Sequence, residues 1–110
     1  MAEQFTIGQG DTWPPIQAAL KDAEGAAVDI TGATVEVNMK AAGGSLTIDH
    51  GAADILVPAS GTVEYEWETL DTATAGSYTF EWEVTFSDGK IATFPNTTDK
   101  IEVTITPQLG

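Results

Sequence analysis

The residues of this chain best suited to chemistry are carboxylates that recur at every second position. Glu64, Glu66 and Glu68 form one such row, and Glu81 and Glu83 form another. Two carboxylic acids that face each other across a sugar are the groups that hydrolyse glycosidic bonds. Alternating acids are also the expected solvent-facing side of an antiparallel sheet, where their charge discourages edge-to-edge association. We favour the second interpretation and predict no catalytic residue, and hence no enzyme.

Other acids could hold a metal ion. Hard cations such as Ca²⁺ bind clustered oxygen ligands, which Asp22, Glu24 and Asp29 could supply, or else Asp49 and Asp54. None of these spacings matches an EF-hand loop, and aspartates that cap turns account for the same residues. We therefore predict no metal-binding residue and no cofactor.

The remaining candidates for chemistry stand alone. His50 is the only histidine and the chain has no cysteine, so a zinc site or a nucleophilic pair around His50 would have no second member. We expect His50 to be an exposed loop residue. The segment Gly8-Gln9-Gly10 lacks the following helix and lysine of a phosphate-binding loop.

The charge balance excludes two classes of partner. Seventeen acidic residues face 4 lysines, for a formal charge of -13. Neutralising phosphates requires a basic patch, whereas the lysines are scattered singly, at Lys21, Lys40, Lys90 and Lys100. We therefore predict that the chain binds neither nucleic acid nor an anionic membrane surface.

Length and hydropathy indicate one domain over residues 1–110. A chain of 110 residues, 42% of them hydrophobic, is long enough to bury one core. No apolar run approaches the roughly 18 residues that would span a bilayer. The N-terminal Met-Ala-Glu-Gln-Phe has neither a basic start nor an apolar stretch, so we expect no secretory signal and a product made in a cytoplasm.

The elements that would position these side chains are β-strands. From Tyr78 to Phe86 every second residue is large and apolar, with threonine and glutamate between. Side chains alternate across a strand with a period of two, so this segment is a half-buried antiparallel strand. Similar alternation predicts strands over Ile16–Asp22, Ala33–Lys40, Thr62–Glu68 and Ile101–Thr106.

Shorter patterns complete the set. Glu3–Ile7 predicts a first strand, and Ile91–Phe94 predicts a hairpin partner for the Tyr78–Phe86 strand, joined to it by an Asp-Gly turn. Residues 41–60 carry a weaker pattern that indicates short edge strands or ordered loop. Seven or eight short strands separated by turn signals predict an all-β fold, an immunoglobulin-like antiparallel β-sandwich. A small barrel is the alternative.

Aromatic residues refine this prediction. An Ala-Gly pair before Tyr78 indicates a tyrosine corner, in which the phenol bonds the backbone a few residues upstream. Trp67 and Trp82 share the inward phase of their strands and are predicted core residues. Trp13 lies outside any such pattern, beside Pro14 and Pro15. We favour a role for Trp13 in capping one end of the sandwich over an exposed contact with a partner.

Several segments follow one another in a recognisable order. They are Gln9–Pro15, Leu20–Asp22 with Gly25, Val28–Val35, Gly61–Tyr65, Asp71-Thr72 with Ala75–Tyr78, and Asp88–Lys90 with Thr93–Pro95. Together they resemble the N-terminal immunoglobulin-like domain of tailed-phage baseplate upper proteins. The resemblance implies architectural residues only, namely Gly10, Asp11, Pro14, Asp29, Gly32, Asp71, Gly76 and Tyr78.

The function that the resemblance implies is structural. We expect a non-enzymatic module of a phage or prophage virion, in the tail or baseplate or as a decoration or adaptor subunit, made in the host cytoplasm. It would act by assembly with other virion proteins, in many copies or as a homo-oligomer, with its acidic faces keeping free subunits soluble. The alternative is a carbohydrate-binding module, which needs at least two aromatic residues out of phase with the core, whereas only Trp13 qualifies.

Overall fold

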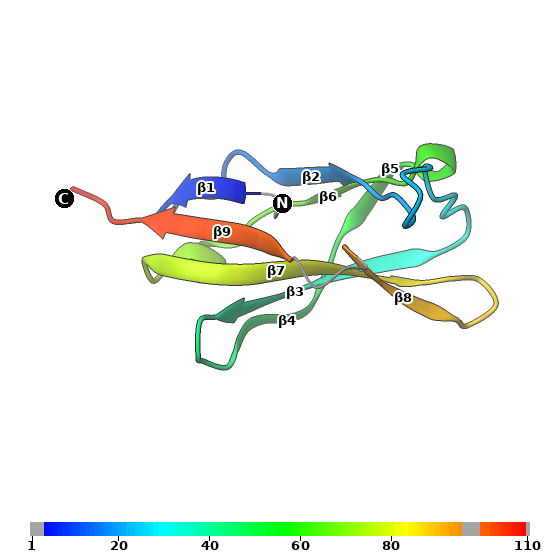
Figure 1. Cartoon of the computed structure of the whole chain (residues 1–110). Helices are drawn as coiled ribbons and strands as arrows, with labels where there is room; N and C mark the ends of the chain where they lie inside the picture. Colours follow the sequence, from blue (N-terminus) through cyan, green and yellow to red (C-terminus); the bar gives the residue numbers. More distant parts are fainter. Residues whose placement is uncertain (1–3, 96–99, 110) are drawn as a thin grey trace.

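Two β-sheets packed face to face make up the chain (Figure 1), in a computed structural model that describes residues 4–95 and 100–109. The strands are β1 (Gln4–Gly8), β2 (Ile16–Ala19), β3 (Thr34–Ala41), β4 (Leu46–Ala52), β5 (Asp54–Val57), β6 (Thr62–Tyr65), β7 (Gly76–Thr85), β8 (Ile91–Phe94) and β9 (Ile101–Thr106). Two short 3-10 helices, η1 (Pro58–Ser60) and η2 (Thr69–Thr72), flank β6. Within these described ranges, no helix has the length and apolar character needed to cross a membrane.

Strand β7 is the centre of the larger sheet. This sheet has the order β1-β9-β7-β3-β4, and β8 also pairs with β7. One edge of β7 serves two strands because β9 pairs with residues 76–80 and β8 pairs with residues 82–85. Strand β1 runs parallel to β9, and the other pairs are antiparallel. The smaller sheet has the order β2-β6-β5 and is antiparallel throughout.

An apolar core fills the space between the sheets. The larger sheet supplies Val35, Val37, Met39, Tyr78, Phe80, Trp82, Val84, Val103 and Ile105, and the smaller sheet supplies Ile16, Val63 and Tyr65. The rings of Phe80 and Trp82 pack edge to face with centroids 5.2 Å apart. Burying each large side chain contributes about 1.5–3 kcal/mol. The predicted core positions of Trp67 and Trp82 are confirmed, since both are buried.

Two predicted local features are also confirmed. The Tyr78 hydroxyl donates to the Thr74 carbonyl at 2.6 Å, which is the bond of a tyrosine corner. At the β7–β8 turn, the Phe86 amide donates to the Lys90 carbonyl at 2.8 Å, and Gly89 takes a φ of 88° that favours glycine. The predicted all-β sandwich is therefore correct, with nine strands in the described residues instead of seven or eight, and the two separate sheets exclude the barrel.

Strand limits differ from the predictions where side chains bond the backbone. The strand predicted over Thr62–Glu68 ends at Tyr65 because Asp71 folds back on it. One oxygen of Asp71 accepts the Tyr65 hydroxyl at 2.5 Å and the Glu68 amide at 2.8 Å, and the chain turns into η2. The first strand is observed from Gln4, and its predicted start at Glu3 lies outside the described residues.

Candidate metal site

Polar side chains line the outer face of the larger sheet, opposite the core. On β3 and β7, Glu36 pairs with Glu83 and Asn38 pairs with Glu81. These positions alternate with buried ones, so their side chains point away from the smaller sheet. Directly opposed carboxylates repel each other, so Glu36 and Glu83 together favour a cation between them.

A β-bulge in β4 adds a histidine to this face. The register between β3 and β4 shifts so that Asp49 and His50 both lie opposite the single residue Asn38. Such bulges bend a strand and re-aim a side chain. His50 has a φ of 56° and is the only non-glycine residue with positive φ among those that the structure describes. This left-handed conformation costs an ordinary residue about 1–2 kcal/mol.

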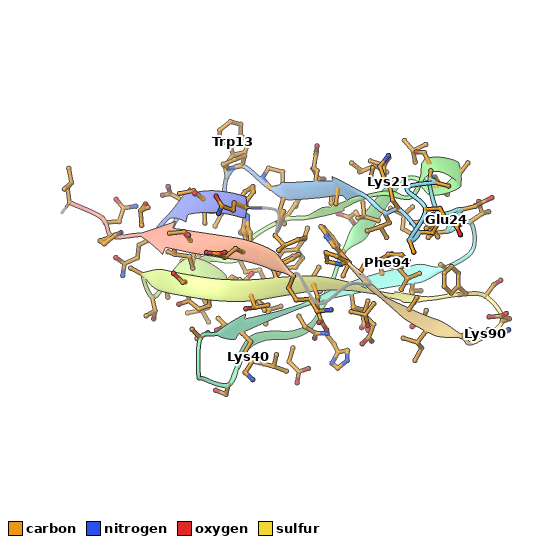
Figure 2. All side chains as sticks on the ribbon, viewed as in Figure 1. Trp13, Lys21, Glu24, Lys40, Lys90 and Phe94 are labelled. Carbon is orange, nitrogen blue, oxygen red and sulfur yellow. The ribbon has the colours of Figure 1, made fainter. Side chains whose placement is uncertain are left out.

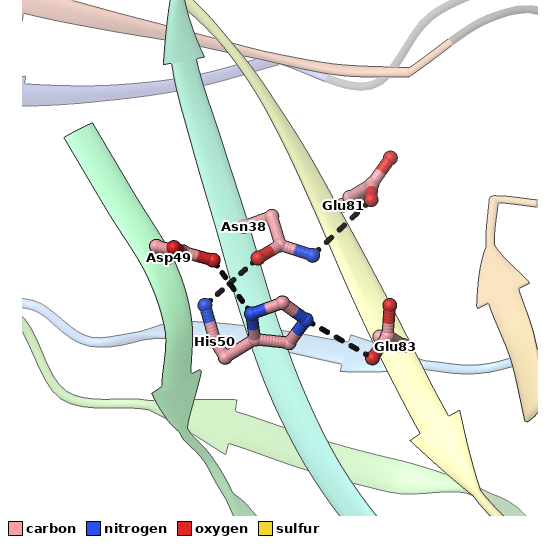
Figure 3. Close-up of polar contacts among 5 residues, drawn as sticks. All are labelled: Asn38, Asp49, His50, Glu81 and Glu83. Atoms are coloured by element: carbon pink, nitrogen blue, oxygen red, sulfur yellow. Dashed lines mark hydrogen bonds and ion pairs between the residues drawn. The ribbon is translucent and has the colours of Figure 1, made fainter. Parts of the chain in front are cut away.

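The contacts of the His50 ring define its orientation (Figure 3). Nδ1 lies 2.6 Å from Oδ1 of Asp49, and Nε2 lies 3.5 Å from Oε1 of Glu83. Three ligand atoms lie within 4.8 Å of one another, one each from Glu36, His50 and Glu83. The hydrogen bond that His50 Nδ1 donates to Asp49 raises the pKa of His50 above its usual value, and the charges of Asp49, Glu83 and Glu36 act in the same direction.

These donors fit a divalent transition-metal ion. An imidazole nitrogen with carboxylate oxygens suits Cu²⁺ or Zn²⁺. Asp49 accepts the Nδ1 proton of His50, which leaves Nε2 free to bind, as a carboxylate partner commonly does for a metal-binding histidine. Atoms about 2 Å from a shared metal lie about 3–4 Å apart. The 3.5 Å separation of His50 Nε2 and Glu83 Oε1 is already in that range. Small side-chain rotations would bring the ligand atom of Glu36, now within 4.8 Å of the other two, into the same range.

Three carboxylates gather on the other sheet. Ligand atoms of Asp54, Glu64 and Glu66 lie within 4.8 Å of one another on the outer side of β5 and β6. Gln17 of β2 donates to Glu64 at 2.7 Å. This group has no nitrogen ligand, and it matches the solvent-facing acidic row predicted from the sequence. We assign it no function.

Two of the predicted calcium candidates, Asp22 and Asp29, cap turns. Oδ1 of Asp22 accepts the amides of Glu24 at 2.9 Å and Ala26 at 3.0 Å. Oδ1 of Asp29 accepts the amide and the hydroxyl of Thr31, and these hydrogen bonds lower the pKa of Asp29. The turn-capping interpretation is therefore confirmed for Asp22 and Asp29. It is wrong for Asp49 and Asp54, which lie within β4 and β5.

The prediction for His50 was right about exposure and wrong about structure. Its side chain is half exposed, but it lies within β4 and not in a loop. The missing ligands, Glu36 and Glu83, come from other strands, so no local sequence signal joins them to His50. The signal available was the Asp-His-Gly interruption of an otherwise strand-like segment.

The residues predicted to be architectural lie at turns, caps and strand ends. Gly10, Gly32 and Gly76 have positive φ, and Pro14 follows a cis peptide bond. The Asp11 amide donates to the Gly8 carbonyl, and Asp29, Asp71 and Tyr78 make the bonds already described.

Trp13 corrects another prediction. Its side chain is 78% exposed and projects from the loop before β2 (Figure 2). The predicted role in capping an end of the sandwich is therefore wrong, because a cap would be covered by the ends of both sheets. Exposure leaves Trp13 as a candidate contact for a partner.

Comparisons with known proteins support the fold. No protein-family model and no curated protein sequence matches the chain. One matching solved structure is CopC from Methylosinus trichosporium OB3b, with a TM-score of 0.54 and 17% identity over 100% of this chain and 89% of that one. At this identity the likeness establishes a CopC-like, immunoglobulin-like sandwich fold.

The resemblance to phage baseplate upper proteins is wrong. The full-length likeness is to CopC, which contradicts the predicted tail, baseplate, decoration or adaptor role. The same likeness contradicts the predicted location in a virion made in a host cytoplasm. The alternative of a carbohydrate-binding module is also wrong: Trp67 and Trp82 are buried, which leaves Trp13 as the single exposed tryptophan.

Proposed function

We propose that the chain is a metal-binding protein that holds a divalent transition-metal ion, Cu²⁺ first, through Glu36, His50 and Glu83. The observation that carries the proposal is the convergence of one imidazole and two carboxylates on three neighbouring strands. The likeness of the fold to that of a copper-binding protein supports the choice of copper.

The chemistry of the donors favours Cu²⁺ over Cu⁺. Nitrogen and oxygen ligands suit the divalent ion, which binds most such sites more tightly than other first-row divalent metals, whereas Cu⁺ prefers sulfur. The chain has no cysteine, and Met39 is fully buried on the core side of β3. The strongly negative net charge would also raise the local concentration of cations.

The part of the chain in binding is to supply a neutral imidazole. The hydrogen bond to Asp49 keeps a proton on Nδ1 of His50. In the imidazolium form, Nε2 must lose its proton before its lone pair can bind a metal, so binding to that form releases a proton. We infer a binding role without catalysis, because the site lies on an open sheet face, whereas a catalytic metal needs a cavity that excludes water and orients a substrate.

Calorimetric titration with Cu²⁺ in a competing glycine buffer tests the proposal. We expect one ion per chain for the unsubstituted protein and loss of affinity by about 100-fold or more in His50→Asn, since asparagine tolerates positive φ but has no imidazole. Glu64→Gln, in the acidic group of the smaller sheet, is the matched control and should bind as the unsubstituted protein does. Unchanged affinity in His50→Asn would contradict the proposal.

A further inference from the structure

Asn38 is a polar residue buried on the outer face of a sheet. Its side chain is 8% exposed although it alternates with the core residues of β3. A buried amide needs hydrogen-bond partners, because an unsatisfied one loses its solvation without compensation. The partners of Asn38 therefore indicate why the residue is there.

Both ends of the Asn38 amide are engaged (Figure 3). Oδ1 accepts the backbone amide of His50 at 2.8 Å, and Nδ2 donates to Oε2 of Glu81 at 3.3 Å. Glu81 in turn lies 3.6 Å from the Lys100 ammonium. A bulge leaves a residue without its regular hydrogen-bond partner in the strand ladder. The side-chain oxygen of Asn38 replaces that partner for the backbone amide of His50.

This bond acts on the backbone that aims the ring. His50 lies in the left-handed region, which costs an ordinary residue free energy and persists only where surrounding contacts hold it. Without the acceptor on Asn38, the bulge could relax toward negative φ. That change would rotate the Cα–Cβ bond of His50 and move Nε2 away from Glu83.

We propose that Asn38 is a positioning residue of the metal site: its carbonyl holds the bulged backbone of His50 so that Nε2 faces Glu36 and Glu83. The inference rests on the proposed function. If Asn38 had only a structural role, replacing it would lower the stability of the fold but would not change the affinity for the metal or the geometry of the bound metal.

Three variants separate these roles. Asn38→Ala removes the acceptor. Asn38→Asp combined with Glu81→Gln keeps an oxygen in the same place and avoids two carboxylates in contact. Thr79→Ala is a control on the same face of β7, where Thr79 is exposed. The measurements are Cu²⁺ affinity by competition, the electron paramagnetic resonance spectrum of bound Cu²⁺, and hydrogen exchange of the His50 amide without metal.

We expect Asn38→Ala to weaken Cu²⁺ binding by about 10–100-fold, as loss of outer-sphere partners does. Its resonance spectrum should change, and its His50 amide should exchange about fivefold faster or more, as loss of one hydrogen bond predicts. Asn38→Asp with Glu81→Gln should keep the amide protection and bind Cu²⁺ about as tightly as the unsubstituted protein, because the new carboxylate still accepts the His50 amide and the new Glu81→Gln amide donates to it. Thr79→Ala should change none of the three.

The outcomes also separate this inference from the proposed function. If the unsubstituted protein binds no Cu²⁺, the proposed function fails and the inference fails with it. If that protein binds and Asn38→Ala keeps its affinity and spectrum, only the inference is overturned. Should Asn38→Ala fail to fold, Asn38→Asp with Glu81→Gln decides alone, because loss of binding in a variant that retains the acceptor for the His50 amide would overturn the inference.

Discussion

The backbone of His50 predicts that an ordinary substitution rule is reversed at this position. In a regular strand, glycine is less stable than alanine by about 0.5–1 kcal/mol, since glycine loses more conformational freedom on folding. At a φ of 56°, the alanine Cβ instead adds a steric cost of about 1–2 kcal/mol that glycine avoids. The difference of the two effects makes His50→Gly more stable than His50→Ala by about 1 kcal/mol.

The comparison isolates the backbone because both variants lose the same ring contacts with Asp49 and Glu83. Thr47 provides the control: it is exposed in the same strand and has no positive φ. There Thr47→Gly should be the less stable variant of its pair. Urea unfolding with a metal chelator present would measure both differences, and thermal unfolding should separate the His50 variants by about 4 °C for a chain of this length.

One result would refute this reasoning. If His50→Gly were less stable than His50→Ala by the margin found at Thr47, β4 would be a regular strand at this point. The bulge, the hydrogen bond from the His50 amide to Asn38 and the direction of the His50 ring would then all be wrong, and the metal site would lose its geometric basis.

Three further predictions follow from individual contacts. Because Asp49 raises the pKa of His50 above 6.5, the His50 imidazolium stabilises the fold below pH 6.5, and that contribution is lost as the pH rises through the folded pKa. NMR titration of Asp49→Asn should show a lower pKa for His50. An unchanged pKa would exclude Asp49 as the cause of the shift. Tyr65→Phe removes a hydrogen bond to the carboxylate of Asp71 and should lower the free energy of unfolding in urea by about 1.5–3 kcal/mol. Tyr78→Phe loses a bond to a neutral carbonyl and should lower it by about 0.5–1.5 kcal/mol. The reverse order would show that the charge of the acceptor does not decide which bond contributes more. Cu²⁺ at 100 times its dissociation constant should raise the melting temperature by about 12 °C, and His50→Asn should abolish that rise.

The sequence predicted the sandwich because the features that define it are local. Alternation with a period of two is set by the strand backbone itself, so the inward positions of Phe80 and Trp82 could be inferred without knowledge of the strand order. The tyrosine corner at Tyr78 was likewise predictable, because the phenol reaches a carbonyl only four residues upstream. Strand limits were less predictable where a distant side chain, such as that of Asp71, competes for the backbone.

The family resemblance failed for a related reason. Its residues, among them Gly10, Gly32 and Tyr78, satisfy turn and corner geometry that many immunoglobulin-like sandwiches share. Such residues predict an architecture, and unrelated functions occur on one architecture. The resemblance was therefore informative about the fold and misleading about the function, which depends on side chains that face outward.

The candidate metal site could not be predicted because it depends on register. Glu36, His50 and Glu83 meet only if β3 lies between β4 and β7 and if β4 carries one extra residue opposite Asn38. Shifting β4 by one residue would move His50 to the other face of the sheet. The sequence shows none of these pairings, so an isolated histidine was interpreted as a loop residue.

The same dependence on register makes the site a rigid one. The residues beneath it, Val37, Met39, Phe80 and Trp82, are all essentially inaccessible, so β3 cannot slide along β7 without opening the core. Glu36 and Glu83 are held opposite each other by that packing, despite the repulsion between their carboxylates. A strained histidine and two repelling acids each reduce the stability of the metal-free protein, and a bound cation would relieve the repulsion. A structural role does not account for these costs, whereas the proposed binding of a cation does.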